Sequence, residues 1–434
     1  MHIIKKISTI LSVILLVFLI YLSINIINDG KKARDFKADY AVLHSTTYGI
    51  FNSDIWTQKV TKIVDTKIES FNLNINNKEE IKGYIKTIIN TLVLEAERVV
   101  KERNKGKRGF FDSLIGSTKQ MITDSIIDFK DLRKRVPEFT DAVMSEVEKP
   151  ENQARAKALL REKLKEFMQE KFKKTTDMTA YNTVIKKYNT KDAKKCNTIL
   201  DNHIHSIRIA LEKTMYLMLG TTTIIIFLIL LQGTLNSLSL IILSFTTITL
   251  LISGIMLPML DIEAKIAQLS FTILDKPILF DNQILFFQSK SISDLVQLLL
   301  ESHRIKMKFV GILLVLFSII FPTLKLIATY MYYYSTNIIG NNPMIRFFAL
   351  RSTKWSMADV FVVSIFMAYL GLDGVVSSEL KHLEAKAIPM NIITTNGSHL
   401  EVGFFLFLGF VLTSFVLSLL VEKSRSKKLN IHKL

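Results

Sequence analysis

The feature that most restricts this chain is a 47-residue stretch, Thr214–Leu260, that contains no Asp, Glu, Lys or Arg. The hydrocarbon core of a bilayer is about 30 Å thick and requires about 20 apolar residues per helix. The stretch therefore predicts two membrane spans, divided by the polar sequence Gln232–Ser237.

Four further apolar stretches bring the prediction to six spans. They are Ile7–Ile27, Phe309–Tyr334, Val360–Leu372 extended back through Trp355, and Val402–Val421. The first follows two lysines, as a signal peptide does, but it exceeds the usual apolar region of about 7–15 residues and no small-x-small cleavage site follows it. We therefore expect a retained N-terminal anchor.

Basic residues in the short flanking segments predict the orientation. They precede the first span, lie between the fourth and fifth, and follow the sixth, as Lys5, Lys6, Arg346, Arg351, Lys354, Lys423, Arg425, Lys427 and Lys428. Six crossings put all of these on one face, which the positive-inside rule makes cytoplasmic. Both chain ends are then cytoplasmic and 28–213 lies on the opposite side, although 259–308 carries six Lys/Arg against six acids and follows the rule only weakly.

The segment 28–213 combines helical periodicity with positive charge. Its apolar residues recur at spacings of three and four, as in Ile81, Ile85, Ile88 and Leu92, which predicts an all-α domain. It carries 37 Lys/Arg against 27 Asp/Glu. The excess fits either anionic phospholipid headgroups or a solvated basic surface. Nucleic acid is not expected as a partner, because no basic motif with interleaved aromatic residues is present.

No sequence motif supports an enzyme. The chain lacks GxxxxGK[ST], GxSxG, HExxH and any Cys/His cluster, and Cys196 is its single cysteine. We expect no catalytic residue, no metal site and no cofactor. Candidate functional groups are therefore the polar residues at membrane depth.

Lys325 is the clearest of these, because it lies within the apolar span 309–334. A charge at membrane depth is costly and usually faces the bundle interior, although a lysine near a span end can instead reach the interface. Pro322, one turn earlier, removes a backbone hydrogen bond and is expected to kink the helix.

Asp359 lies at the predicted entrance of the fifth span, in the sequence WSMADVF. Trp355 suits the membrane interface, and Ser356 is placed to cap the helix whose first turn contains Asp359. If the fourth and fifth spans are neighbours, Asp359 and Lys325 both lie toward the cytoplasmic side and can pair. The alternative is that Asp359 only stabilises its own helix start.

Two connections also carry a structural prediction. The segment 265–287 alternates β-prone residues and predicts a short hairpin turning at Asp281–Gln283, followed by an amphipathic helix at Ser291–Leu300. From Lys191 into the second span no helix breaker occurs, which predicts one continuous helix linking the outer domain to the membrane.

Residues from about 240 to 421 resemble the paraquat-inducible protein A family. The resemblance rests on FPTLKL and WSMADVF at this separation, with Leu257-Pro258-Met259-Leu260-Asp261 before them and Arg351 between them. It implies a bacterial inner-membrane protein that moves phospholipid together with MCE-type (mammalian cell entry) tunnel proteins. Its motif positions are Pro258, Pro322, Lys325, Arg351, Trp355, Ser356, Met357 and Asp359, with Lys325, Asp359 and Ser356 as candidates for a polar relay that uses the proton gradient.

The chain departs from that family by having one membrane module and no zinc ribbon, and homo-oligomerisation could replace a second module. We expect an all-α polytopic membrane protein with six transmembrane helices, a short outer β-hairpin and an extracytoplasmic helical domain. Its expected parts are an anchor, an outer domain, a second span, a four-helix module and a basic tail, at 1–27, 28–213, 214–235, 236–422 and 423–434. Alternatives to lipid transport are an envelope-maintenance adaptor and a proton-coupled transporter of small solutes.

Overall fold

The computed structural model of the chain describes residues 2–50, 177–190, 192–233, 235–273, 276–334, 342–351, 391–396 and 399–431, together with scattered single residues and short runs between 52 and 162 and Ser364. Five of the described helices are long and apolar enough to cross a membrane. They coincide with five of the six predicted spans. The remaining predicted span, 360–372, apart from Ser364, and most of the predicted outer domain lie outside the described residues.

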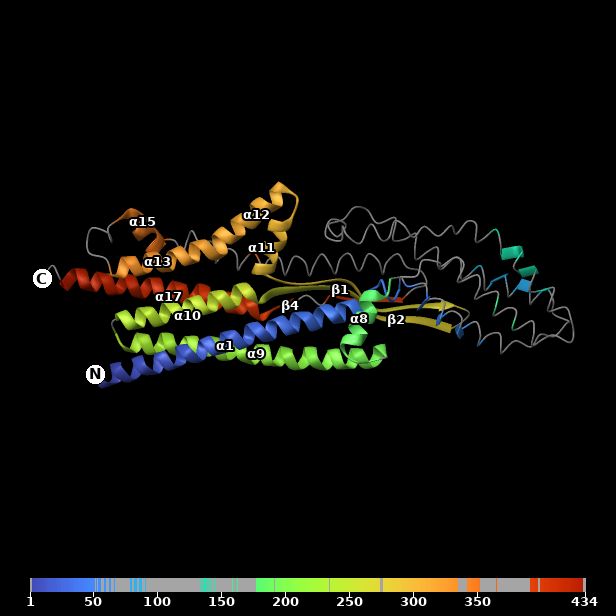
Figure 1. Cartoon of the computed structure of the whole chain (residues 1–434), viewed down its shortest axis with the longest axis horizontal. Helices are drawn as coiled ribbons and strands as arrows, with labels where there is room; N and C mark the ends of the chain where they lie inside the picture. The colour runs from blue at the N-terminus through green and yellow to red at the C-terminus, as the bar shows by residue number, and fades with distance from the viewer. Residues whose placement is uncertain are drawn as a thin grey trace.

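The described elements follow one another in a simple order. The helices are α1 (His2–Leu43), α8 (Thr179–Lys187), α9 (Ala193–Leu231), α10 (Ser237–Met256), α11 (Ile292–Glu301), α12 (Ile305–Val315), α13 (Phe321–Tyr334), α15 (Pro343–Arg346) and α17 (Val402–Ile431). The strands are β1 (Pro258–Ile273), β2 (Lys276–Ser291), β3 (Asn391–Asn396) and β4 (His399–Leu400). Short π-helices occupy Leu316–Ile320 and Phe347–Arg351. The ends of α1 and α17 nearest the two chain termini lie at the same end of the molecule (Figure 1).

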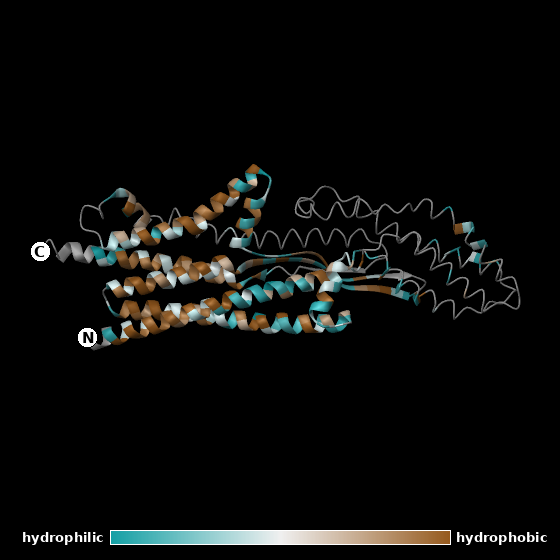
Figure 2. Cartoon of the chain, in the orientation of Figure 1, coloured by the Kyte–Doolittle hydropathy of each residue, from teal (hydrophilic) through white to brown (hydrophobic). Residues whose placement is uncertain are grey.

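Helices α1 and α9 form a stalk that continues beyond the membrane bundle. They contain 42 and 39 residues, and at 1.5 Å per residue each is roughly 60 Å long, about twice the hydrocarbon thickness. One half of each helix is apolar and the other half is polar (Figure 2). The continuous helix predicted from Lys191 onward is confirmed as α9, which begins after Asp192, whose carboxylate accepts from the backbone N–H of Lys194.

A pair of stacked rings joins the two stalk helices, and an ion pair joins α1 to the end of α8. The ring of Phe36 on α1 stacks on His203 of α9 with centroids 5.0 Å apart. Near the end of the stalk, Asp39 accepts from Lys187 Nζ at 2.6 Å and from the Tyr188 hydroxyl at 2.7 Å. The stalk therefore has its own packed interface, with polar contacts near its end.

Helix α10 is the central helix of the bundle. In its most apolar window 72% of the residues are buried, against 28–50% in the other four candidate spans. It packs against α1 through a 2.8 Å hydrogen bond between the hydroxyls of Ser253 and Ser23. On its other side, Gly254 lies so close to α17 that an added Cβ would be 2.8 Å from the backbone N of Phe407.

The directions of α13 and α17 bear on the number of crossings. Lys325 contacts Ser414 and, further along both helices, Tyr332 contacts Arg425, so α13 and α17 run in the same direction. Both run away from the sheet (Figure 1). The segment between Arg351 and Asn391, where the fifth span is predicted, lies outside the described residues apart from Ser364.

The outer loop is a longer sheet than the sequence predicts. Strands β1 and β2 each contain 16 residues and form an antiparallel hairpin, which at about 3.3 Å per residue extends roughly 50 Å. Strands β3 and β4 pair with the other edge of β1, so the sheet order is β2-β1-β3. The described chain is mostly helical, as predicted, but the expectation of a single short hairpin is wrong, because the strands are long and two more strands join them. The amphipathic helix after the hairpin is confirmed as α11.

The predicted hairpin turn at Asp281–Gln283 is also wrong. Asp281 and Gln283 lie within β2, paired with Gln268 and Ile266 of β1, and the chain turns between Ile273 and Lys276. Asn282 has a φ of 51°, a left-handed conformation that Asn tolerates better than most residues. The polar sequence Asp281–Gln283 thus marks an irregularity inside a strand. Ile284, directly after it, forms a β-bridge with Ser45.

The contact between α10 and α17 generates a stability prediction. Gly254→Ala forces a methyl group against the Phe407 backbone and should reduce the free energy of unfolding by about 1–3 kcal/mol. Gly220→Ala on α9 is the control, because its Cβ would meet nothing within 4 Å. Thermal unfolding of the purified variants in detergent measures both effects. An unchanged midpoint for Gly254→Ala would contradict the close packing.

Candidate functional site

Lys325 is buried inside the helix bundle, as one of the two sequence interpretations predicts. Its residue exposure is 2%, and its Nζ donates to Ser414 Oγ at 2.7 Å and to the Ser414 carbonyl oxygen at 3.3 Å. Within the part of the chain that the structure describes, no carboxylate lies within ion-pair distance of this ammonium. Lys325 therefore does not reach the interface, and its described partners are the neutral oxygens of one serine.

The backbone disturbance expected at Pro322 takes the form of a π-helix. Residues Leu316–Ile320 are π-helical, and the N–H of Phe321 bonds to the carbonyl of Leu316, five residues earlier. Pro322 has no N–H to offer to the carbonyl of Ser318, and the buried Ser318 hydroxyl has no hydrogen-bond partner among the described residues. Such π-turns occur frequently at functional sites, and this one lies one turn from Lys325.

A second cation holds the far ends of α13 and α17 together. Arg425 is buried, donates from Nη1 to the carbonyl of Tyr332 at 2.6 Å, and lies 3.9 Å above the centre of the Tyr332 ring. The adjacent Tyr333 donates its hydroxyl to the Leu235 carbonyl at 2.6 Å. The sequence assigned Arg425 only to the basic cluster after the sixth span, whereas the structure also gives it this packing role.

The other motif residues are distributed as follows. Pro258 is buried and begins β1 directly after α10, and Arg351 ends the second π-helix. Four motif residues at the start of the fifth predicted span lie outside the described residues: Trp355, Ser356, Met357 and Asp359. The pairing of Lys325 with Asp359 therefore stays a prediction. Sequence analysis missed Ser414, although its spacing of four from Ser418 in an apolar span indicates a polar helix face.

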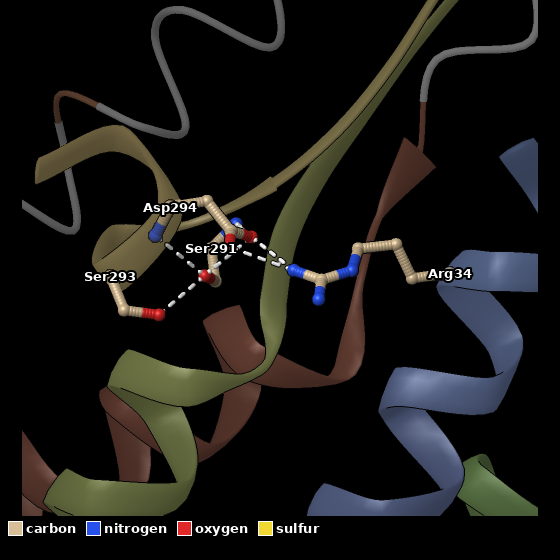
Figure 3. Close-up of polar contacts among 4 residues, drawn as sticks. All are labelled: Arg34, Ser291, Ser293 and Asp294. Atoms are coloured by element: carbon tan, nitrogen blue, oxygen red, sulfur yellow. Dashed lines mark hydrogen bonds and ion pairs between the residues drawn. The ribbon is translucent and has the colours of Figure 1, made fainter. Parts of the chain in front are cut away.

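At the sheet end of the bundle, α11 is fixed to the stalk by a polar junction (Figure 3). Arg34 of α1 donates from Nη1 to both carboxylate oxygens of Asp294 at 2.7 Å. The same carboxylate accepts from the backbone N–H and the hydroxyl of Ser291, which caps α11. Partial burial acts to raise the pKa of Asp294, but the hydrogen bonds from Ser291 and the Arg34 guanidinium together hold this pKa below its usual range.

The contact of Lys325 generates the second prediction. Ser414→Ala removes the only side chain that accepts from this ammonium in the described structure, so it should cost about 1.5–3 kcal/mol, as expected for a hydrogen bond to a charged group. Ser418→Ala, one turn further along α17, removes only a bond to its own helix and should cost less. Thermal unfolding compares the two. Equal losses would show that the ammonium gains nothing from Ser414.

Comparison with known proteins identifies part of the membrane module. The model of the family described as "Paraquat-inducible protein A" matches residues 277–382, about a quarter of the chain. No curated protein and no solved structure matches the chain. The matched segment contains α11, α12, α13 and both sequence motifs, and it is narrower than the resemblance seen from the residues alone. On this match, the segment that holds Pro322, Lys325 and WSMADVF is similar to the paraquat-inducible protein A family.

Proposed function

We propose that this chain is a non-enzymatic inner-membrane subunit of a system that transports phospholipid between bacterial membranes. In this proposal it works with an MCE-type tunnel protein and uses the proton gradient. Both chain ends are cytoplasmic, and the stalk, the sheet and the segment between them lie in the periplasm. The family match supports the membrane assignment, and the remainder is our inference.

The observation that carries the proposal is the buried ammonium of Lys325. Keeping a charge inside a bundle costs several kcal/mol when it lacks an ionic partner, and such groups in membrane proteins usually mark a transport or proton pathway. Here the described partners are neutral oxygens, and in the π-helix beside Lys325 the Ser318 hydroxyl has no hydrogen-bond partner among the described residues. The Lys325 ammonium and the neighbouring serine hydroxyls can therefore take up or release a hydrogen-bonded partner that carries a proton while a substrate passes.

The hairpin of α11 and α12 supplies an apolar surface for such a substrate. Figure 1 shows α11 running across the direction of the spans, with α12 leading back into the bundle. Gly311 of α12 allows close packing against Leu299 of α11. The outward-facing residues Ile305, Phe309 and Val310 are exposed. At the outer membrane surface, we infer that this apolar hairpin guides acyl chains toward the sheet.

A second candidate is favoured by the stalk. Because α1 and α9 run without a break from the membrane into the outer region, displacement of the outer region would be transmitted directly to the bundle. This continuity suits an adaptor that connects envelope machinery to the membrane and carries no lipid itself.

Lys325→Met tests the leading proposal, because methionine retains the volume of the side chain and removes its charge. We expect transport of labelled phospholipid between donor and acceptor membranes to fall by about tenfold or more, the kinetic equivalent of losing an ionic hydrogen bond. Lys308→Gln is the control, since it removes an exposed lysine from the start of the same span. Protein level is measured for both variants.

The competing functions give different results in the same experiment. Normal lipid transport and envelope integrity in Lys325→Met, with bound lipid absent from the purified wild type, would support the adaptor. Proton-coupled uptake of a soluble compound into proteoliposomes, again without bound lipid, would support a solute transporter. Either outcome would reject the lipid proposal.

A further inference from the structure

Three charged side chains meet where the stalk, the sheet and the last span join. Lys37 of α1 donates from Nζ to Asp261 Oδ2 of β1 at 2.6 Å and to Oε1 of Glu401, the residue before α17, at 2.7 Å. We call Lys37, Asp261 and Glu401 the outer triad. Because both carboxylates bind the same ammonium, the distance from Asp261 Oδ2 to Glu401 Oε1 cannot exceed the sum of their two distances to Lys37 Nζ.

With all three groups ionised, the outer triad carries one uncompensated negative charge. Asp261 is only 4% exposed, and its Oδ1 accepts no hydrogen bond from any described residue. Ser289, the residue opposite Asp261 in the β1–β2 register, is also buried and its hydroxyl is likewise unpaired within the described structure. A buried excess charge and unpaired oxygens are both costly. One added proton neutralises the charge and supplies an O–H donor.

The charged groups around the outer triad do not supply the missing positive charge. They are engaged in pairs of their own, which are Arg34 with Asp294 at 2.7 Å, Lys265 with Glu263 at 3.3 Å and Arg208 with Glu212 at 2.9 Å. The charge of Glu401 also acts on Arg208 of α9. His399 of β4 lies opposite Asp261 in the register, but it is exposed.

We propose that the outer triad is a proton-binding site in which Asp261 and Glu401 share one proton, and that this proton tightens the joint between α1, β1 and α17. The proposal goes beyond phospholipid transport and does not depend on it, because the ligand is a proton and the site is distinct from Lys325. In the bound state, the triad is neutral and its two carboxyl groups can hydrogen-bond. In the unbound state, two carboxylates repel each other across a single ammonium.

The electrostatic environment places proton exchange near neutral pH. Burial raises the pKa of Glu401 to about 7, and the charge of Asp261 acts in the same direction, against the opposing effect of Lys37. Since this value is above that of an unfolded-state glutamate, the proton favours the folded joint. Its stabilisation is complete at acidic pH and is lost as the pH rises through about 7. Between pH 6 and 8 the ionised fraction of such a group rises about tenfold.

Thermal unfolding of the full chain in nanodiscs of zwitterionic lipid tests this titration. As the pH rises from 5.5 to 8, the unfolding midpoint of the wild type should fall relative to that of Glu401→Gln, because glutamine mimics the protonated carboxyl at every pH. Asp29→Asn is the control, since Asp29 is another carboxylate beside an α1 lysine, but in an exposed pair. A difference between wild type and Glu401→Gln that is constant with pH would overturn the proposal.

Asp261→Asn provides a second variant in case glutamine at 401 prevents folding. It removes the charge that helps to raise the pKa of Glu401, so the midpoint of the pH titration should fall below that of wild type. A midpoint that remained near 7 would show that the two carboxylates do not share a proton.

Cysteine accessibility tests the mechanical part of the proposal. In a Cys196→Ala background, a Ser289→Cys thiol is placed opposite Asp261. We measure the rate at which this thiol is modified in the chain with the wild-type triad and divide it by the rate in the Glu401→Gln chain at the same pH. We expect this ratio to rise up to about tenfold from pH 6 to 8, because the ionised fraction rises by that factor. Taking this ratio cancels the pH dependence of the thiol itself. A ratio of one at every pH would show that the proton does not tighten the joint.

Discussion

The bilayer imposes the constraint on which the rest of the structure depends. Its hydrocarbon core offers no water to backbone N–H and C=O groups, so each span must be helical and any irregular backbone must be enclosed by protein. The described spans obey this rule. The π-helix before Pro322 is the described departure within a span, and the buried hydroxyl of Ser318 lies in that turn. The same constraint limits where a cation such as Lys325 can be placed.

Prediction from the sequence was most successful where that constraint acts. Long apolar stretches located the five described spans, because length and apolarity largely decide whether a helix crosses a membrane. Burial of Lys325 is the one of the two predicted alternatives that keeps the ammonium inside the bundle, away from lipid. The contact with Ser414 could not be predicted in the same way, because it depends on which two helices are neighbours and at what rotation.

Outside the membrane the sequence was a poorer guide. The Asp281–Gln283 segment has the composition of a turn, but tertiary pairing with β1 and with Ser45 keeps it in a strand. Strand β3 comes from a part of the chain more than a hundred residues after its partner β1, and local periodicity carries no information on such pairing. The outer triad was missed for the same reason, since its members are separated by hundreds of residues.

The central place of α10 has a consequence for biosynthesis. Its packing partners include the first span and the last, α1 and α17, so its core cannot be completed until the last helix has been made. At about 5–20 residues per second, a ribosome needs roughly 10–30 s to proceed from Met256 to Arg425. During this interval Gly254 has no α17 to pack against, and the free edge of β1 has neither β3 nor β4. The nascent chain therefore passes through a period in which its most buried helix and its central strand both depend on temporary partners.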